Sequence, residues 1–145
     1  IDSHEGALFF DQNIFKPYLE VGEENQLPVF VPSDVAVHFD KRFPKPENVV
    51  IVENFHMALP SLEFKDWNNY YINIIENLKP GLSEIIVHLG YDDKEMQQIT
   101  VEHPNYGSKW RNLDMEVVSS ENFKQALKDN NIKLVTWREI KNIIY

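Results

Sequence analysis

The sequence contains no cysteine and no long apolar run, and each absence excludes a class of protein. Without cysteine the chain has no disulfide and no thiolate metal site, so any metal must be held by His, Asp, Glu or main-chain oxygen. No apolar segment approaches the roughly 20 residues that span a bilayer. A Gly-rich phosphate loop, a nucleophile elbow and a His-Glu-x-x-His motif are also absent, which disfavours nucleotide-dependent enzymes, serine hydrolases and zincins.

Basic residues are scarce, because 14 Lys and Arg stand against 23 Asp and Glu, for a formal net charge of −9. We therefore expect neither nucleic acid nor an anionic membrane as a main partner.

The 145 residues, 43% of them hydrophobic, suffice for a single domain over residues 1–145 with a buried core. The sequence starts Ile1-Asp2-Ser3-His4, with neither Met nor a signal-peptide pattern, so we expect a cytoplasmic protein, and a chain that is either the middle of a longer protein or a processed or trimmed one.

Short apolar segments alternate with amphipathic ones along the chain, which predicts an α/β fold with a parallel sheet. Strands are expected at residues 27–32, 49–52, 84–87 and 132–135. Helices are expected from Lys16-Pro17 onward, at 67–78 with Asp66 as cap, at 109–118, at 121–129, and after Thr136-Trp137-Arg138-Glu139, which is a capping-box pattern. Four strands are few for a closed barrel of about eight strand–helix units, so the chain would be part of one.

His88 ends the apolar run 84–87 and is followed by Leu89-Gly90-Tyr91-Asp92-Asp93. In parallel α/β folds, loops at the carboxyl ends of strands build the functional site. We therefore predict His88 as a site residue and Asp92 as a base or ligand, whereas Asp93 better fits a cap for the next helical turn. The alternative for His88 is a core histidine whose ring is satisfied by a backbone carbonyl.

His4 stands in Asp2-Ser3-His4-Glu5-Gly6, where Asp2 could orient the imidazole or join the coordination sphere of a metal. The alternative is a mobile terminus without a role. Three other histidines carry weaker signals: His56 follows an apolar strand and could line a cleft, His103 is expected to be solvated, and His38 gives no specific signal.

The aromatic stripe Trp67, Tyr70 and Tyr71 recurs at helical spacing, which is typical of a core face rather than a sugar-binding platform. Trp110 has a more polar context and could serve either purpose.

Four stretches together resemble a known family in their order and spacing. They are residues 2–9 (Asp-Ser-His-Glu-Gly-Ala-Leu-Phe), 78–88 (Leu-Lys-Pro-Gly-Leu-Ser-Glu-Ile-Ile-Val-His), 90–93 (Gly-Tyr-Asp-Asp) and 132–140 (Ile-Lys-Leu-Val-Thr-Trp-Arg-Glu-Ile). The family is that of the YdjC-like carbohydrate deacetylases, which act on chitooligosaccharides and hopanoid sugars and belong to the polysaccharide-deacetylase-like folds. Members often have His-Pro-Gly where this chain has His88-Leu89-Gly90.

The resemblance implies a distorted parallel (β/α) barrel that binds a divalent metal, Mg²⁺ or Zn²⁺, through one Asp and two His. The histidines would be His4 and His88. The metal-binding Asp, with a neighbouring Asp proposed as the base, belongs to a motif near the family's N-terminus that this sequence lacks, so the chain would be the later part of the family's domain. Asp2 and Asp92 would then be the catalytic carboxylates.

The implied activity is hydrolysis of N-acetyl groups on acetylated mono- or oligosaccharides. One alternative is a non-catalytic carbohydrate-binding or structural member that has lost the acidic motif. A further alternative is an unrelated α/β hydrolase of another substrate class. A partial barrel would expose sheet edges, so a homo-oligomer is a further expectation.

Overall fold

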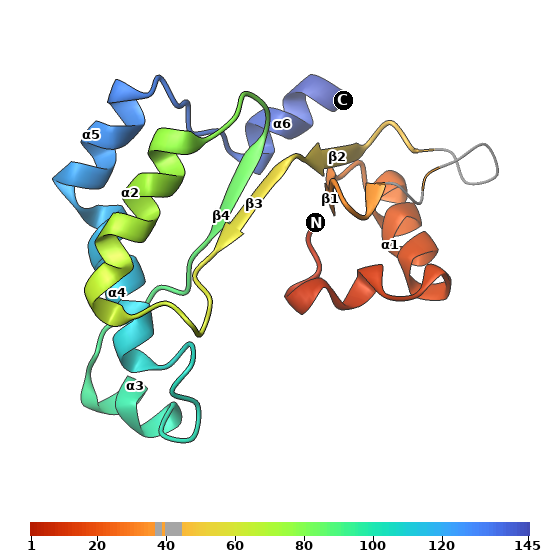
Figure 1. Cartoon of the computed structure of the whole chain (residues 1–145). Helices are drawn as coiled ribbons and strands as arrows, with labels where there is room; N and C mark the ends of the chain where they lie inside the picture. Colours follow the sequence, from red (N-terminus) through yellow and green to blue (C-terminus); the bar gives the residue numbers. More distant parts are fainter. Residues whose placement is uncertain (37–38, 40–44) are drawn as a thin grey trace. The chain divides into compact units, whose positions relative to one another are not determined.

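The computed structural model describes residues 1–36, 39 and 45–145, and its residues divide into two compact units (Figure 1). Unit 1 comprises Ile1–Asn54, Gly81–Ser83 and Leu134–Tyr145, and unit 2 comprises Phe55–Pro80 and Glu84–Lys133. The described strands form two two-stranded sheets, one in the order β1-β2 and one in the order β3-β4. The fold is therefore mixed α/β, as the alternating sequence pattern predicts.

The sheet of unit 1 pairs β1 (Val29–Pro32) with β2 (Val49–Val52) in parallel, with Val29 opposite Val49. Val29 and Val31 are completely buried. On the other side of β1, the amino group of Ile1 donates to the carbonyl of Pro28, and the N–H of Phe30 donates to the carbonyl of Ile1 at 3.0 Å. Ile1 bonds to the residues on either side of Val29, which is the hydrogen-bond pattern of two parallel strands. Ile1 thus extends the sheet, and the Asp2-Ser3-His4 segment follows directly.

Helix α1 (Gln12–Glu24) packs on this sheet through Phe15, Tyr18, Leu19 and Gly22. The expectation that it starts at Lys16-Pro17 is wrong, because Asp11 caps it earlier by accepting the N–H of Asn13 at 2.8 Å. Pro17 lies inside the helix, where it lacks a main-chain donor. Gly22 allows close approach, since a Cβ there would lie 2.1 Å from Cγ2 of Val29.

Strands β3 (Asn54–Met57) and β4 (Ser83–Ile86) begin side by side, because Nδ2 of Asn54 donates to Oγ of Ser83 at 3.1 Å. The strand expected at residues 84–87 is therefore present, one residue earlier. The sequence did not predict β3, which lies in the connection after β2.

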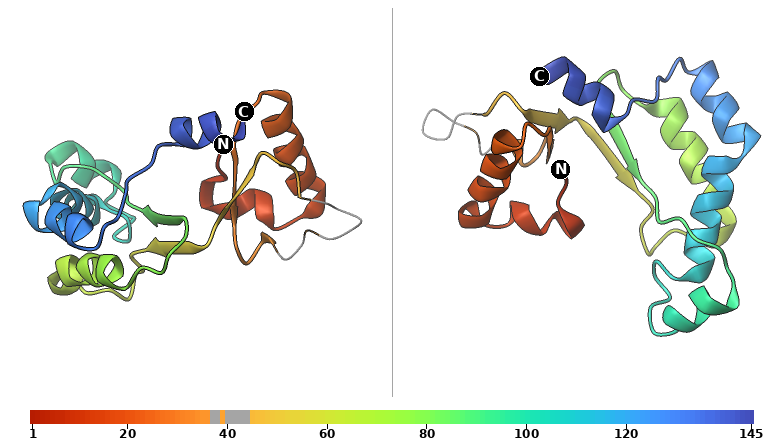
Figure 2. Two further views of the ribbon diagram at one scale, coloured as in Figure 1. Left: turned by 90° about the horizontal axis from the view of Figure 1, so that it is seen from above. Right: turned by 180° about the vertical axis from the view of Figure 1, so that it is seen from behind.

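The core of unit 2 forms among helices α2 (Trp67–Asn77), α4 (Ser108–Ser119) and α5 (Glu121–Asp129), which lie side by side in both views of Figure 2. Trp67 and Tyr71 are buried there, and Tyr70 packs against them, so the aromatic stripe is core as expected. Trp110 also belongs to this core. Asp66 occupies the cap position of α2, but the expectation that its side chain caps the helix is wrong, since it makes no capping bond.

Unit 2 also contains two short helices. Helix η3 (Phe64–Asp66) precedes α2, and helix α3 (Lys94–Ile99) follows β4. In unit 1, α6 (Trp137–Ile144) starts with the expected capping box of Thr136 and Glu139. The strand expected at residues 132–135 is absent, because those residues pair with no neighbouring strand and Leu134 is 73% exposed. Within the described part of the chain, no helix is both long and apolar enough to cross a membrane.

Candidate functional site

His88 follows β4 by two residues, at the start of the loop that the sequence marks as a site. Its main-chain N–H donates to Oδ2 of Asp114 at 2.8 Å. Its ring is half-buried and lies against the ring of Tyr106, with 4.8 Å between the ring centroids. Both the backbone and the ring of His88 are therefore in contact with residues far along the chain.

Asp114 is completely buried in α4, and its carboxylate accepts three hydrogen bonds. Oδ2 accepts the N–H of His88. Oδ1 accepts hydrogen bonds from Nε1 of Trp67 at 2.8 Å and from the hydroxyl of Tyr71 at 2.6 Å. A carboxylate removed from water requires such partners. The three donors thus account for a charged group in an otherwise apolar core.

Tyr71 is a permanent donor in this arrangement. Burial raises the pKa of its hydroxyl far above the usual range, and the hydrogen bond to Asp114 raises it further. The proton therefore stays on Tyr71 across the whole physiological pH range.

The sequence analysis missed Asp114, although a signal was present. Trp110, Asp114 and Val117 are spaced i, i+4 and i+7, which places the aspartate on the apolar face of its helix. A polar residue among core positions needs a buried partner, and that pattern could have identified it.

An aromatic series extends from His88 across unit 2. Tyr106 contacts Trp110 at a centroid distance of 4.5 Å, Trp110 contacts Trp67 at 4.7 Å, and Trp67 contacts Phe64 at 5.6 Å. Phe64, at the far end, is 46% exposed. The series therefore connects the His88 loop to the protein surface.

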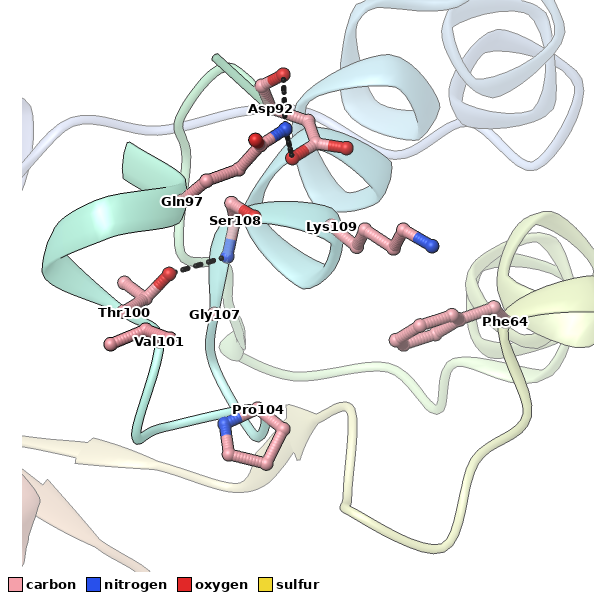
Figure 3. Close-up of a pocket in the computed structure, with 9 residues that line it drawn as sticks. All are labelled: Phe64, Asp92, Gln97, Thr100, Val101, Pro104, Gly107, Ser108 and Lys109. Atoms are coloured by element: carbon pink, nitrogen blue, oxygen red, sulfur yellow. Dashed lines mark hydrogen bonds between the residues drawn. The ribbon is translucent and has the colours of Figure 1, made fainter. Parts of the chain in front are cut away.

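Phe64 and Asp92 line one surface pocket of unit 2 (Figure 3). Nε2 of Gln97 donates to Oδ1 of Asp92 at 2.9 Å, and the N–H of Asp92 donates to Oδ1 of Asn112 at 3.3 Å. Hydrogen bonds from Gln97 and Ser108, together with the charge of Lys109, lower the pKa of Asp92. The pocket thus combines an exposed ring with a carboxylate that stays ionised.

Asp93 caps α3 by accepting the N–H of Met96 at 2.9 Å, so the capping role expected from the sequence is confirmed. Asp92 and Asp93 therefore have different surroundings although they are adjacent in the chain.

In unit 1, His4 is the first residue of the 3₁₀ turn η1 (His4–Phe9), and its side chain is exposed. The buried Ser3 accepts the N–H of Leu8 on Oγ at 2.9 Å, and Asp2 accepts the N–H of Ser3 on Oδ1 at 2.6 Å. Glu5 has a φ of 53°, a left-handed conformation that is uncommon outside glycine. These bonds, with those of Ile1, argue against a frayed terminus.

The structure places His4 and Asp2 in unit 1 and His88 and Asp92 in unit 2. Within residues 1–36, 39 and 45–145, no group of three or more His, Asp or Glu side chains lies close enough together to hold a metal ion. His103 is exposed, as expected for a solvated residue, and His56 is half-buried in β3. His38 lies outside the described residues.

Comparison with known proteins agrees with the resemblance seen in the sequence. The family model described as YdjC-like protein matches residues 1–129. The chain belongs to the YdjC-like protein family. A search of curated proteins finds no match.

The structure of this YdjC-like chain is similar to a crystal structure from Enterococcus faecalis V583, that of a protein provisionally named for cellobiose-phosphate cleavage. The similarity has a TM-score of 0.65 at 14% identity and covers 97% of this chain and 52% of the other. The chain thus spans about half the length of that neighbour, and at this identity the likeness is one of fold.

Proposed function

We propose that the protein containing this chain is a metal-dependent carbohydrate deacetylase that removes N-acetyl groups from acetylated mono- or oligosaccharides. The observation that carries the proposal is the YdjC-like match over residues 1–129, which includes both histidine motifs. The name of the structural neighbour, which refers to a sugar phosphate, supports a carbohydrate substrate. We further propose that the chain forms part of a distorted parallel (β/α) barrel.

The residues of this chain suit a divalent cation. The donor set consists of imidazoles and carboxylates without thiolate, which fits Zn²⁺ and, with more oxygen ligands, Mg²⁺. His4 and His88 would be ligands, with a further carboxylate from outside this sequence. A carboxylate holds the backbone of His88, and Tyr106 contacts its ring, so the position of this proposed ligand is fixed on two sides.

A bound divalent cation supplies polarisation of the amide carbonyl and a lowered pKa of water. In the net reaction water adds to the carbonyl carbon, the C–N bond breaks, and acetate and a free amine leave. Asp92, whose pKa is lowered by its hydrogen bonds, would accept a proton or orient a sugar hydroxyl in its pocket. Asp2, two residues from His4, would orient that imidazole.

The test uses the protein expressed from its complete reading frame. We expect acetate release from N-acetylated chitooligosaccharides, and we expect a chelator to abolish it. The His4→Ala and His88→Ala variants should each lose about 10-fold or more in metal affinity and most of the turnover, whereas His103→Ala, at an exposed position, should match the wild type.

Two results would change the proposal. Sugar binding without acetate release would favour the non-catalytic alternative. Loss of turnover with unchanged metal affinity in His88→Ala would show that His88 acts on the substrate rather than on the metal. The sequence encoded upstream of Ile1 gives an independent check, because the proposal requires an acidic motif that residues 1–145 do not contain.

A further inference from the structure

We infer that Asp114 is the positioning residue of His88, so that α4 controls the geometry of a proposed metal ligand. The inference rests on the proposed function only in treating His88 as a ligand. The contacts of His88 with Asp114 and with Tyr106 both lie within unit 2.

The two oxygens of Asp114 have separate tasks. Oδ1 accepts from Trp67 and Tyr71, both on α2, and thereby fixes the carboxylate within the core. Among the described residues, Oδ2 accepts the N–H of His88 alone, at 2.8 Å. The carboxylate therefore connects helices α2 and α4 to the backbone of the site loop through hydrogen bonds of the strong, carboxylate type.

The same helix also supports the imidazole ring. Trp110 lies four residues before Asp114, on the same face of α4, and its ring contacts Tyr106 at 4.5 Å. Tyr106 in turn contacts the His88 ring at 4.8 Å. Helix α4 thus holds the backbone of His88 directly, through Asp114, and the ring of His88 indirectly, through Trp110 and Tyr106.

The arrangement offers a substitution that separates the two tasks. In Asp114→Asn, one amide oxygen remains as an acceptor, and it satisfies two donors if it faces Trp67 and Tyr71. The amide NH₂ then faces the N–H of His88, where two donors repel each other. The variant should keep the core contacts and lose the bond to His88.

Tyr71→Phe is the matched control, because it removes a partner of Oδ1 and leaves Oδ2 with His88. Both variants alter one hydrogen bond of the same buried carboxylate. A purely structural role for Asp114 predicts similar effects of the two variants on the His88 loop, whereas a positioning role predicts effects only in Asp114→Asn.

Two measurements on the complete protein decide the matter: hydrogen exchange of the His88 main-chain amide by NMR, and titration with Co²⁺ followed by visible absorption. We expect Asp114→Asn to lose His88 amide protection and about 10- to 100-fold in Co²⁺ affinity, and Tyr71→Phe to change both by less than about 3-fold. Equal losses in the two variants, or protection and affinity unchanged in Asp114→Asn, would overturn the inference. If the wild type binds no Co²⁺, the proposed function fails, and the amide exchange still tests whether Asp114 holds His88.

Discussion

The two units fix their candidate site segments by different means. In unit 1 the segment before His4 is held by several bonds, because the main chain of Ile1 bonds to the edge of β1 and the hydroxyl of Tyr18 lies 2.9 Å from the Ile1 carbonyl. In unit 2 the His88 loop is held by the buried side chain of Asp114, 26 residues further along the chain. The segment of unit 1 therefore keeps its main-chain bonds when a side chain such as Tyr18 is changed, whereas the bond to the His88 backbone is lost when one carboxylate is removed.

The largest effect is expected from Asp114→Ala, which removes the acceptor of three donors, two of them in buried hydrogen bonds. Donors left without partners in a core cost free energy, and we expect the stability of unit 2 to fall by about 3–5 kcal/mol. Chemical denaturation followed by tryptophan fluorescence measures the change. Asp66→Ala, at an exposed aspartate without a capping bond, is the control and should shift stability by less than about 0.5 kcal/mol. Equal effects of the two variants would contradict the buried network.

The next effect, in unit 1, is that of Gly22→Ala. The new Cβ would meet Cγ2 of Val29 at 2.1 Å and Nδ2 of Asn48 at 2.9 Å, so α1 must move away from β1. Overpacking of this kind costs about 1–3 kcal/mol, of which the better helix propensity of Ala returns a part. The shift of the urea midpoint tests it. Val21→Ala, at the exposed neighbour, should destabilise less, and the reverse order would disprove the close approach of α1 and β1.

A smaller effect is expected from Tyr18→Phe, which removes the hydroxyl that lies within hydrogen-bond distance of the carbonyls of Ile1 and Phe30. The carbonyl of Ile1 keeps its bond from Phe30, so we expect a loss of only about 0.5–1.5 kcal/mol. Thermal unfolding of the variant beside Asp114→Ala compares the two units directly. A loss as large as that of Asp114→Ala would show that unit 1 also depends on a single polar side chain.

The smallest effect concerns pH and Asp92. Hydrogen bonds from Gln97 and Ser108 lower its pKa in the folded protein, so it contributes stability above its unfolded pKa and loses that contribution as the pH falls through the folded pKa. The titration of its carboxyl carbon by NMR should give a pKa below 3.8. Gln97→Ala should raise it toward that value, and an unchanged titration would show that the Gln97 bond does not determine the pKa.

Local signals in the sequence predicted those elements that local contacts determine. The apolar run at residues 49–52 predicted the bounds of β2, and the position of Asn130-Asn131 predicted the end of α5. The capping box of Thr136 and Glu139 was predicted because it is a contact within one helical turn. The YdjC-like motifs and the loop position of His88 were also predictable, because a histidine after an apolar strand is a local pattern.

The misses concern contacts between distant residues. Residues 132–135 have a strand composition but no neighbouring strand, and β3 is a strand because β4 pairs with it. The spacing of Asp114 marks it as a polar residue on an apolar helix face, but its partners, which lie on α2 and after β4, could not be predicted. No spacing along the chain indicates which buried polar residue meets which loop, so the support of His88 required the structure.

The division of the chain has a consequence for biosynthesis. Unit 1 includes Leu134–Tyr145, whereas unit 2 ends at Lys133. On a ribosome, which adds residues from the N-terminus onward, every segment of unit 2 is made before the last segment of unit 1. Every residue of the Asp114 network is thus synthesised before α6, so the bonds of Asp114 to Trp67, Tyr71 and His88 involve no residue of the last segment of unit 1.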